Sequence, residues 1–381
     1  MKYLKNTTKI WIALLALLSF LCAAVIPVYA ASETDGAVVS AQQQMVRDAI
    51  TDISEVLLLQ TAHPKPGSIG GEWLMLGLAR SDIAMDNGYA AQYYDSLESL
   101  VKAKKGVLHS RKNTEYSRVV LALTALKKDP TNVAGYNLLT PLGDYKKTVQ
   151  QGINGAVFAL LALDSGNYAM PIHPNATIKA TREHYIDYIL EKELSGGGWT
   201  LSGSTADVDV TAMVLQALSP YQEIDKVKAA IDRGVQILSD LQNTQGGFSS
   251  YGLSGCESTA QVIVALTALG IDLEDSRFVK NNNSTLDHLL TYYQKGKGFT
   301  HTIDGKIDAM ATEQAFYALV AVQRAAAGKN HLYDMTEEVD KESASNANSQ
   351  PNQLTGVQKV VAEQWLFQQS NIMKANTIIV H

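Results

Sequence analysis

The feature that most constrains this chain is a repeated pattern in which a glycine turn ends in an aromatic residue and leads, after a short loop, into an apolar helix. The pattern is clearest over residues 196–218, recurs over 246–266, and recurs more weakly over 298–319. The threonines that align in the three copies are Thr211, Thr259 and Thr312. Their spacings of about 48 and 53 residues lie near the periods of helical repeat arrays. We therefore expect a protein built from helical repeats.

The spacing of hydrophobic residues is helical along nearly the whole chain, which predicts an all-α protein. Polar, amphipathic segments alternate with segments that are apolar almost all round and should therefore be buried. The predicted polar helices are 42–60, 89–104, 177–193, 225–242 and 284–294, and the predicted apolar helices are 70–79, 114–126, 154–163, 210–218, 259–269 and 310–325. Pairs of this kind suit two helical layers, arranged as a ring or as an open solenoid.

The N-terminus has the pattern of an export signal. Lys2, Lys5 and Lys9 precede an apolar run over residues 10–26, and Val28-Tyr29-Ala30 is a small-residue site of the kind that signal peptidase cleaves. We expect a signal peptide over 1–30, a helical domain over 31–335, and a polar linker with a flexible tail over 336–381. The expected location is secreted or on the extracellular surface. An uncleaved N-terminal anchor is the alternative, and it would be the only membrane contact.

Charge and cysteine content narrow the classes of partner. The formal net charge is -6, with both signs scattered along the chain, so no basic surface for nucleic acid is expected. Removal of the leader leaves Cys256 as the only cysteine, so stability must come from the core and not from a disulfide. No Ser-x-x-Lys, Gly-x-Ser-x-Gly, His-Glu-x-x-His or phosphate-binding glycine loop is present in the sequence.

The glycine turn with its aromatic residue, followed by a helix that opens with Thr-Ala, resembles the repeat of the terpenoid cyclase and protein prenyltransferase superfamily. The resemblance covers about residues 42–333. The superfamily's Gln-x-x-x-Gly-x-Trp element resembles residues 242–248, with Phe for Trp, and 193–199, with Glu for Gln. The resemblance implies a closed α/α toroid of about six helical hairpins, in which this element links neighbouring outer helices.

The stretch from Asp207 to Ala212 resembles the Asp-x-Asp-Asp-Thr-Ala acid motif of squalene-hopene-type cyclases. The resemblance implies Asp209 as the acid that protonates an isoprenoid. Val210 replaces the last aspartate of the motif, and the chain has length for only one toroid, whereas such cyclases place the active site between two. A terpene cyclase-like or prenyltransferase-like enzyme with Asp209 as acid is therefore the second hypothesis, and we favour a protein without catalytic activity.

Two further resemblances concern bound groups. Protein prenyltransferases hold zinc with Asp, Cys and His, for which Asp207, Cys256 and His301 are the candidates, but the residues around Cys256 depart from the family pattern and no metal is expected. The architecture is most similar to that of exported bacterial toroid proteins related to cobalamin carriers. A corrinoid is therefore a candidate ligand, and no cofactor is otherwise expected.

The repeats also select candidate site residues. Alignment places Asp209, Glu257 and Met310 at one equivalent position at the start of an apolar helix, where helix capping is the alternative role. The candidate ligand-binding residues are Asp207, Asp209, Tyr251, Cys256, Glu257, Trp73 and Glu115. The leading hypothesis is a binding module that holds a small hydrophobic or corrinoid-like ligand, or a protein partner, at the mouth of the ring. A structural surface protein is the third.

Overall fold

The computed structural model describes residues 40–250 and 252–337. The chain divides into two compact units, Met1–Ala41 and Gln42–His381, and the first lies almost wholly outside the described residues. The predicted signal peptide, the tail from residue 338 onward and the site candidate Tyr251 also lie outside them. The second unit contains the helical layers.

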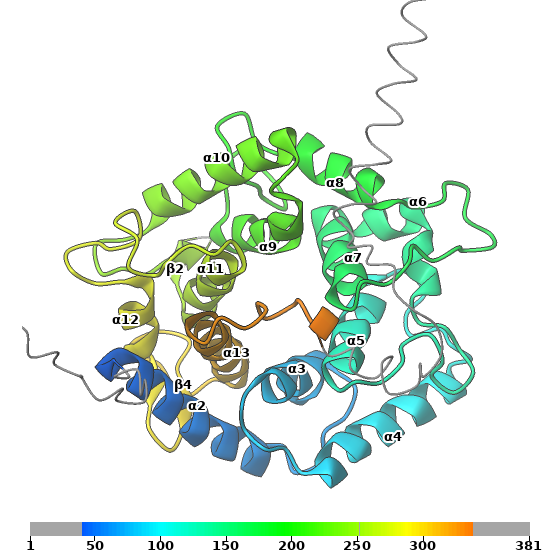
Figure 1. Cartoon of the computed structure of the whole chain (residues 1–381), viewed down its shortest axis with the longest axis horizontal. Helices are drawn as coiled ribbons and strands as arrows, with labels where there is room; N and C mark the ends of the chain where they lie inside the picture. Colours follow the sequence, from blue (N-terminus) through cyan, green and yellow to red (C-terminus); the bar gives the residue numbers. More distant parts are fainter. Residues whose placement is uncertain (1–39, 251, 338–381) are drawn as a thin grey trace, which may run out of the picture. The chain divides into compact units, whose positions relative to one another are not determined.

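Six apolar helices form the inner layer of the second unit (Figure 1). They are α3 (Trp73–Arg80), α5 (Thr114–Ala125), α7 (Ile153–Ser165), α9 (Val208–Leu218), α11 (Cys256–Ala268) and α13 (Ala309–Ala326). Each packs against the next in this order, and α13 packs against α3. This last contact closes the ring, so the predicted α/α toroid is confirmed and the open solenoid is excluded.

A second set of helices surrounds the ring (Figure 1). They are α2 (Ala41–Gln60), α4 (Asn87–Ala103), α6 (Tyr145–Thr148), α8 (Arg182–Glu191), α10 (Asp225–Leu241) and α12 (Thr285–Leu290). Two antiparallel hairpins, β1 (Ser249–Ser250) with β2 (Leu253–Ser254) and β3 (Tyr293–Gln294) with β4 (Gly298–Phe299), stand beside them. The alternation of polar and apolar segments thus reflects the two layers.

Three outer segments differ from the sequence prediction. The third pair has an outer element that was not predicted, because α6 is only one turn long and continues from the 3-10 turn η2 (Thr140–Gly143) into the 3-10 turn η3 (Val149–Gln151). Pro141 and several glycines interrupt the helical spacing there. The helix predicted over 177–193 begins only at Arg182, after the N-cap Thr181, and that over 284–294 ends at Leu290 before hairpin β3–β4.

The repeated threonine holds the aromatic residue of the glycine turn in place. The Thr211 hydroxyl accepts a hydrogen bond from the Trp199 backbone N–H at 3.0 Å, and the Thr312 hydroxyl accepts one from Phe299 at 2.9 Å. Trp199 is fully buried and donates its indole N–H to the Ile189 carbonyl at 2.8 Å. The turn requires glycine, because Gly198 has φ +73° and a Cβ there would lie 2.9 Å from the Ala206 Cβ.

The N-caps of α9 and α13 are not the residues that the sequence suggested. Asp207 accepts a hydrogen bond from the Val210 N–H at 3.0 Å and is the N-cap of α9, and Asp308 does the same for α13 with the Ala311 N–H at 2.9 Å. The capping interpretation of Asp209 is therefore wrong. It fails because the aspartate two positions earlier already occupies the cap.

The Gln-x-x-x-Gly-x-Trp-like elements link neighbouring outer helices, as the resemblance implied. Gln242, directly after α10, donates to the Phe278 carbonyl at 2.8 Å and to the Thr285 hydroxyl, the first residue of α12, at 3.1 Å. Glu193, just after α8, receives two hydrogen bonds from Arg233 of α10, at 2.6 and 2.8 Å. Both contacts fix one outer helix to the next around the ring.

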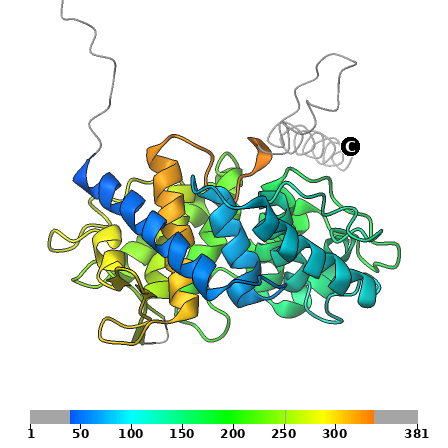
Figure 2. The same cartoon turned by 90° about the horizontal axis from the view of Figure 1, so that it is seen from below.

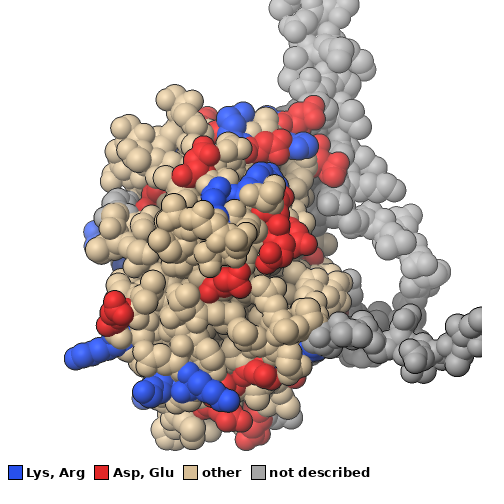
Figure 3. Space-filling view, turned by 90° about the vertical axis from the view of Figure 1, so that its left-hand side faces the viewer, with Lys and Arg blue, Asp and Glu red and all other residues tan. Residues whose placement is uncertain are grey.

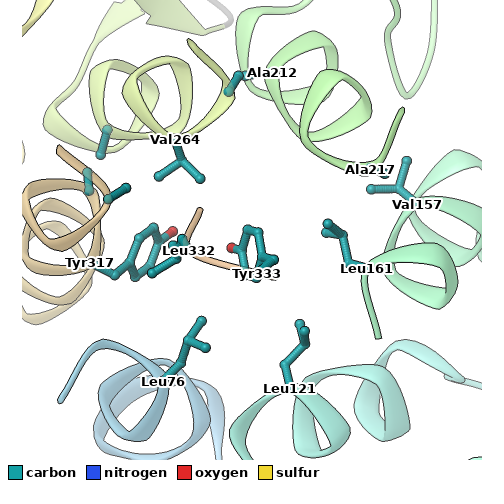
Figure 4. Packing of buried hydrophobic residues seen from close by; sticks show 14 of the residues in the cluster. Leu76, Leu121, Val157, Leu161, Ala212, Ala217, Val264, Tyr317, Leu332 and Tyr333 are labelled. Carbon is teal, nitrogen blue, oxygen red and sulfur yellow. The ribbon is translucent and has the colours of Figure 1, made fainter. Parts of the chain in front are cut away.

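The two ends of the ring differ. The inner helices all run in the same direction, and residues 328–337 cross the end where they finish (Figure 2). Leu332 and Tyr333 of this segment are buried at the centre of the ring (Figure 4). Arg80 donates to the Leu332 carbonyl at 3.1 Å and to the Asp334 carbonyl at 2.7 Å. We call this the sealed end, and the end where the inner helices begin is the mouth.

Candidate ligand-binding mouth

The mouth is lined by the first two turns of the inner helices. Residues three or four apart on one helix face the same way, so five of the inner helices present one side chain at the opening and a second one turn deeper, whereas α3 presents Trp73 alone. These side chains are partly exposed, whereas those a further turn down are buried. The residues of the mouth are Trp73, Glu115, Arg118, Asn154, Phe158, Asp209, Met213, Glu257, Gln261, Met310 and Gln314.

Aromatic and aliphatic side chains close the centre of the ring below the mouth. Trp73 lies with its ring centroid 6.0 Å from that of Phe158 and 6.1 Å from that of Tyr317. Because α3 and α7 are not neighbours in the ring, the Trp73 side chain must reach across its centre. The next layer contains Leu76, Leu121, Leu161, Val264 and Tyr317, which point inward around Tyr333 (Figure 4).

Three glutamines and a tyrosine join the inner helices beneath the opening. Gln216 of α9 donates to the side-chain oxygen of Gln261 at 3.0 Å. Gln261 of α11 donates in turn to Gln314 at 3.0 Å and to the Tyr317 hydroxyl at 2.6 Å, both on α13. This belt fixes one half of the mouth, so its side chains are held in place before anything binds.

The two aspartates of the acid-like motif have different surroundings. Both carboxylate oxygens of Asp207 accept hydrogen bonds. Oδ1 caps α9 by accepting from the Val210 N–H, and Oδ2 accepts from the Ser250 hydroxyl at 2.6 Å. Asp209 faces the mouth, and its Oδ1 is buried without a hydrogen-bond partner among the described residues. Burial raises the pKa of Asp209, the Asp207 and Glu257 carboxylates raise it further, and the Ser258 and Ser250 hydroxyls oppose them.

Two other candidates from the repeat lie near Asp209. Glu257, at the start of α11, accepts a hydrogen bond from His301 Nδ1 at 2.7 Å. Cys256 is fully buried, with its sulfur 3.9 Å from the Ala311 carbonyl of α13, and burial holds the pKa of its thiol well above the ordinary value. Cys256 is therefore a packed thiol and not a side chain that faces the mouth.

A network of charges lies on the opposite side of the mouth. Arg118 donates to Glu115 at 2.6 Å and to Glu72 at 2.8 Å, and Glu72 also accepts from the Tyr93 hydroxyl at 3.1 Å and from the Gly67 N–H. Burial raises the pKa of Glu72, and the charge of Arg118 opposes this. Glu115 was predicted from the sequence as a site residue. Glu72 was not predicted, because its partners are up to 46 positions away in the sequence.

Glu313 of α13 is a second buried carboxyl that the sequence analysis missed. It is 4% exposed and accepts a hydrogen bond from the Gly70 N–H, just before α3, at 2.6 Å. Burial raises its pKa to about 7, the nearby Glu72 adds to this, and the Gly70 bond opposes it. A signal was present, because Glu313 stands where the other two copies of the repeat have Ala212 and Ala260.

The structure does not bring the zinc candidates together. Asp207 is bonded to Ser250, His301 pairs with Glu257, and Cys256 is packed against α13. Within residues 40–250 and 252–337, no group of three or more His, Cys, Asp or Glu residues is arranged to hold a metal ion.

Apolar side chains remain exposed on the loops that lead into the inner helices. They are Ile69, Val107, Leu201, Leu253 and Ile303. On the face shown in Figure 3, acidic and basic side chains are interspersed. None of the helices in the described part of the chain combines the length and apolar character that a membrane span requires.

Comparison with known proteins finds weak structural similarities and no match in sequence. No family model matches the sequence, and no curated protein matches it. The unsaturated glucuronyl hydrolase of Bacillus sp. GL1, responsible for the degradation of glycosaminoglycan, is similar in structure with a TM-score of 0.49 and 12% identity over 77% of this chain and 99% of that chain. A UGL variant with dGlcA-Glc-Rha-Glc gives a TM-score of 0.42 and 13% identity over the same shares.

These similarities are weak in both sequence and coordinates, so the assignment to the α/α-toroid class rests on the helix contacts described above. The relation to terpenoid cyclases and prenyltransferases stays a prediction from the repeat. The function is therefore argued from the chemistry of the mouth.

Proposed function

We propose that this protein is an exported, non-catalytic binding module that holds an organic ligand at the mouth of its toroid. The observation that supports the proposal is the buried Oδ1 of Asp209, which has no hydrogen-bond partner among the described residues. Burying an unpaired polar oxygen is unfavourable, so such an atom at a functional position suggests a partner that arrives from outside.

Two features of Asp209 separate it from an ordinary structural aspartate. The cap of α9 is already supplied by Asp207, so Asp209 is not needed as the N-cap. The side-chain amide oxygen of Asn154, on the neighbouring inner helix α7, is likewise buried without a partner among the described residues. Two hydrogen-bond acceptors thus remain unused at equivalent depths of adjacent helices.

The lining indicates the kind of ligand. Trp73, Phe158 and Met213 supply apolar surface, and the unused polar atoms are acceptors, so the ligand should combine an apolar face with hydrogen-bond donors. An isoprenoid diphosphate fits poorly, because Arg118 is the one lysine or arginine among the mouth residues and is already bound to Glu72 and Glu115. A corrinoid, an uncharged isoprenoid and a protein partner remain the candidates.

Native mass spectrometry tests the proposal. The chain from Ala31 onward would be incubated with a mixture of corrinoids and isoprenoid lipids, and the double variant Asp209→Asn, Glu257→Gln would be treated in parallel. We expect a stoichiometric adduct that the double variant loses. Asp187→Asn, on the outer helix α8 and half-exposed, is the matched control and should keep it.

An adduct that survives the double variant would place the site away from the mouth and contradict the proposal. Absence of any adduct would direct the search to a protein partner, for which the exposed loop residues Leu201, Leu253 and Ile303 are the first to replace. Export is tested separately by N-terminal sequencing of the secreted protein, which should begin at Ala31.

One observation favours a second candidate function, an enzyme that uses Asp209 as an acid on an isoprenoid. Burial raises the pKa of Asp209 and so shifts the carboxyl toward the protonated form that a general acid requires. Turnover that Asp209→Asn abolishes, with the helical circular dichroism unchanged, would establish this function in place of simple binding. Product that is unaffected by the substitution would exclude Asp209 from catalysis.

A further inference from the structure

Residues 328–337, which we call the seal, are attached to the ring by two buried arginines of the inner helices. Arg80 of α3 donates to backbone carbonyls of the seal at distances from 2.7 to 3.4 Å. Arg324 of α13 donates to one of the same carbonyls at 2.8 Å, and both arginines pair with Glu337. The polar attachment of the seal therefore depends chiefly on these two side chains.

The side chains in the middle of the seal are buried without hydrogen bonds. Leu332 and Tyr333 lie at the centre of the ring (Figure 4). Tyr333 is 5% exposed, and its hydroxyl makes no hydrogen bond with any described residue. Nδ1 of His331 is likewise buried without a partner in the described part of the chain. Apolar contact alone holds these side chains, and unpaired polar atoms reduce what their burial contributes to stability.

His331 lies beside both arginines. Arg80 donates to its carbonyl at 3.0 Å, and Arg324 donates to the carbonyl just before it at 2.8 Å. Burial lowers the pKa of His331, the two guanidinium charges lower it further, and the Asp334 carboxylate opposes them. A second proton on this ring would add a positive charge beside two others and would leave a buried N–H at Nδ1 without an acceptor.

The other charged groups around the seal have partners of their own. Glu337 is bound to both arginines, and Lys329 pairs with Asp82 at 2.5 Å. Asp164, the buried carboxyl of α7 that interacts with Asp334, accepts a hydrogen bond from Arg182 at 2.7 Å. Among the described residues, Asp334 is thus the one group that favours the charged form of the imidazole.

We propose that the seal is a pH-dependent gate, in which protonation of His331 releases residues 331–335 from the ring and uncovers its apolar centre. This inference goes beyond the proposed function, because it does not depend on what the mouth binds. In the released seal, His331 should titrate near its ordinary value of 6.5, so below this pH the released form binds more protons than the closed form.

The closed form is therefore favoured above pH 6.5 and is lost as the pH falls. The ratio of released to closed seal should rise by up to about tenfold for each pH unit below 6.5, until the lowered pKa of the closed form is reached.

Hydrogen exchange of the full chain at pH 7.5 and 5.5, followed by mass spectrometry and corrected for the intrinsic pH dependence of exchange, tests the gate. A suitable probe is the Met335 N–H, which is bonded to the Ser165 carbonyl at 2.8 Å. We expect protection of the seal to fall by up to about tenfold at pH 5.5, while that of α7 stays constant. His331→Gln should remove this pH dependence, and His184→Gln, at an exposed position of α8, should keep it.

Three results would overturn the gate. They are equal protection of the seal at both pH values, an undiminished fall in His331→Gln, and a parallel loss of protection in α7, which would mean global unfolding. If His331→Gln does not fold, Glu337→Gln replaces it as the test. That variant weakens the pairs with both arginines, so it should raise exchange of the seal at both pH values by a similar factor and retain the fall. Loss of the fall would assign the pH dependence to Glu337 and contradict the inference.

Discussion

The two ends of the ring differ in how their polar side chains are bound. At the sealed end, Arg80 and Arg324 donate to backbone carbonyls of residues 330–334 and pair with Glu337, so the segment that covers the ring is bound at several points. At the mouth, the side-chain atoms Asp209 Oδ1 and Asn154 Oδ1 are buried without a hydrogen-bond partner among the described residues, and at the sealed end the same is true of His331 Nδ1. The contrast suggests that stability is concentrated at one end and binding at the other.

The common direction of the inner helices explains the charges at each end. Helix C-termini carry partial negative charge and exposed carbonyls, which Arg80 and Arg324 complement at the sealed end. Helix N-termini carry partial positive charge, which favours Asp207, Asp209 and Glu257 at the mouth. The helix N-termini therefore stabilise these three carboxylates in place of lysine or arginine partners.

The largest expected effect is at the sealed end. Arg80→Ala should lower the free energy of unfolding by about 3–5 kcal/mol, because the buried carbonyls of Leu332 and Asp334 would lose their donor and Glu337 a partner. Lys228→Ala, which removes an ion pair with Asp232 in which both side chains are exposed, should cost no more than about 1 kcal/mol. Urea unfolding followed by circular dichroism measures both, and equal losses would contradict the special role of the sealed end.

The next effect is at Glu313 and depends on pH. Its pKa is raised from the ordinary 4.5 to about 7, so between these values the folded state binds more protons than the unfolded chain and stability falls as pH rises. Glu313→Gln should match the wild type near pH 4.5 and exceed its unfolding free energy by up to about 3 kcal/mol at pH 8.

Thermal or urea unfolding across this pH range measures the difference between the two proteins. Glu72, Tyr89 and Tyr317 interact with Glu313, and their presence in both proteins makes the difference specific to it. Parallel pH profiles for variant and wild type would show that Glu313 titrates in its ordinary range.

The smallest expected effects distinguish the two aspartates of α9. Asp207→Ala should cost about 1–2 kcal/mol, because the helix loses its cap and Ser250 loses its acceptor. Asp209→Ala should cost less, no more than about 1 kcal/mol, because its Oδ1 makes no hydrogen bond among the described residues and only the hydrogen bonds from the Ser258 and Ser250 hydroxyls to the carboxyl are lost. Chemical denaturation measures both, and a reversed order would assign the structural role to Asp209.

The sequence predicted the inner layer well, because each inner helix is buried on all sides and its apolar residues are continuous. Five of the outer segments were also visible as amphipathic helices, whereas α6 was not, because proline and glycine break the spacing around it. The repeat alignment predicted Asp209 and Glu257 at equivalent positions, and the structure places both at the mouth.

Contacts that depend on ring closure could not be predicted. Glu313 and Gly70 are 243 positions apart, and they meet because α13 packs against α3. The seal of residues 328–337 was equally hidden, since Glu337 lies in a stretch whose composition indicates a linker, yet it pairs with Arg324. Local patterns encode the helices and caps, whereas these pairs follow from how the first and last repeats meet.

The central claim is that the carboxyl of Asp209 is buried at the mouth with one oxygen left without a partner among the described residues. The most direct test of this claim is the pKa of Asp209 in the ligand-free protein. Carboxyl 13C NMR of aspartate-labelled protein, with Asp209→Asn for assignment, would give its titration midpoint. We predict a midpoint above the ordinary range of aspartate, which changes when a ligand binds at the mouth. A midpoint at or below the ordinary value in the free protein would show that the chain already compensates Asp209 and would contradict the account.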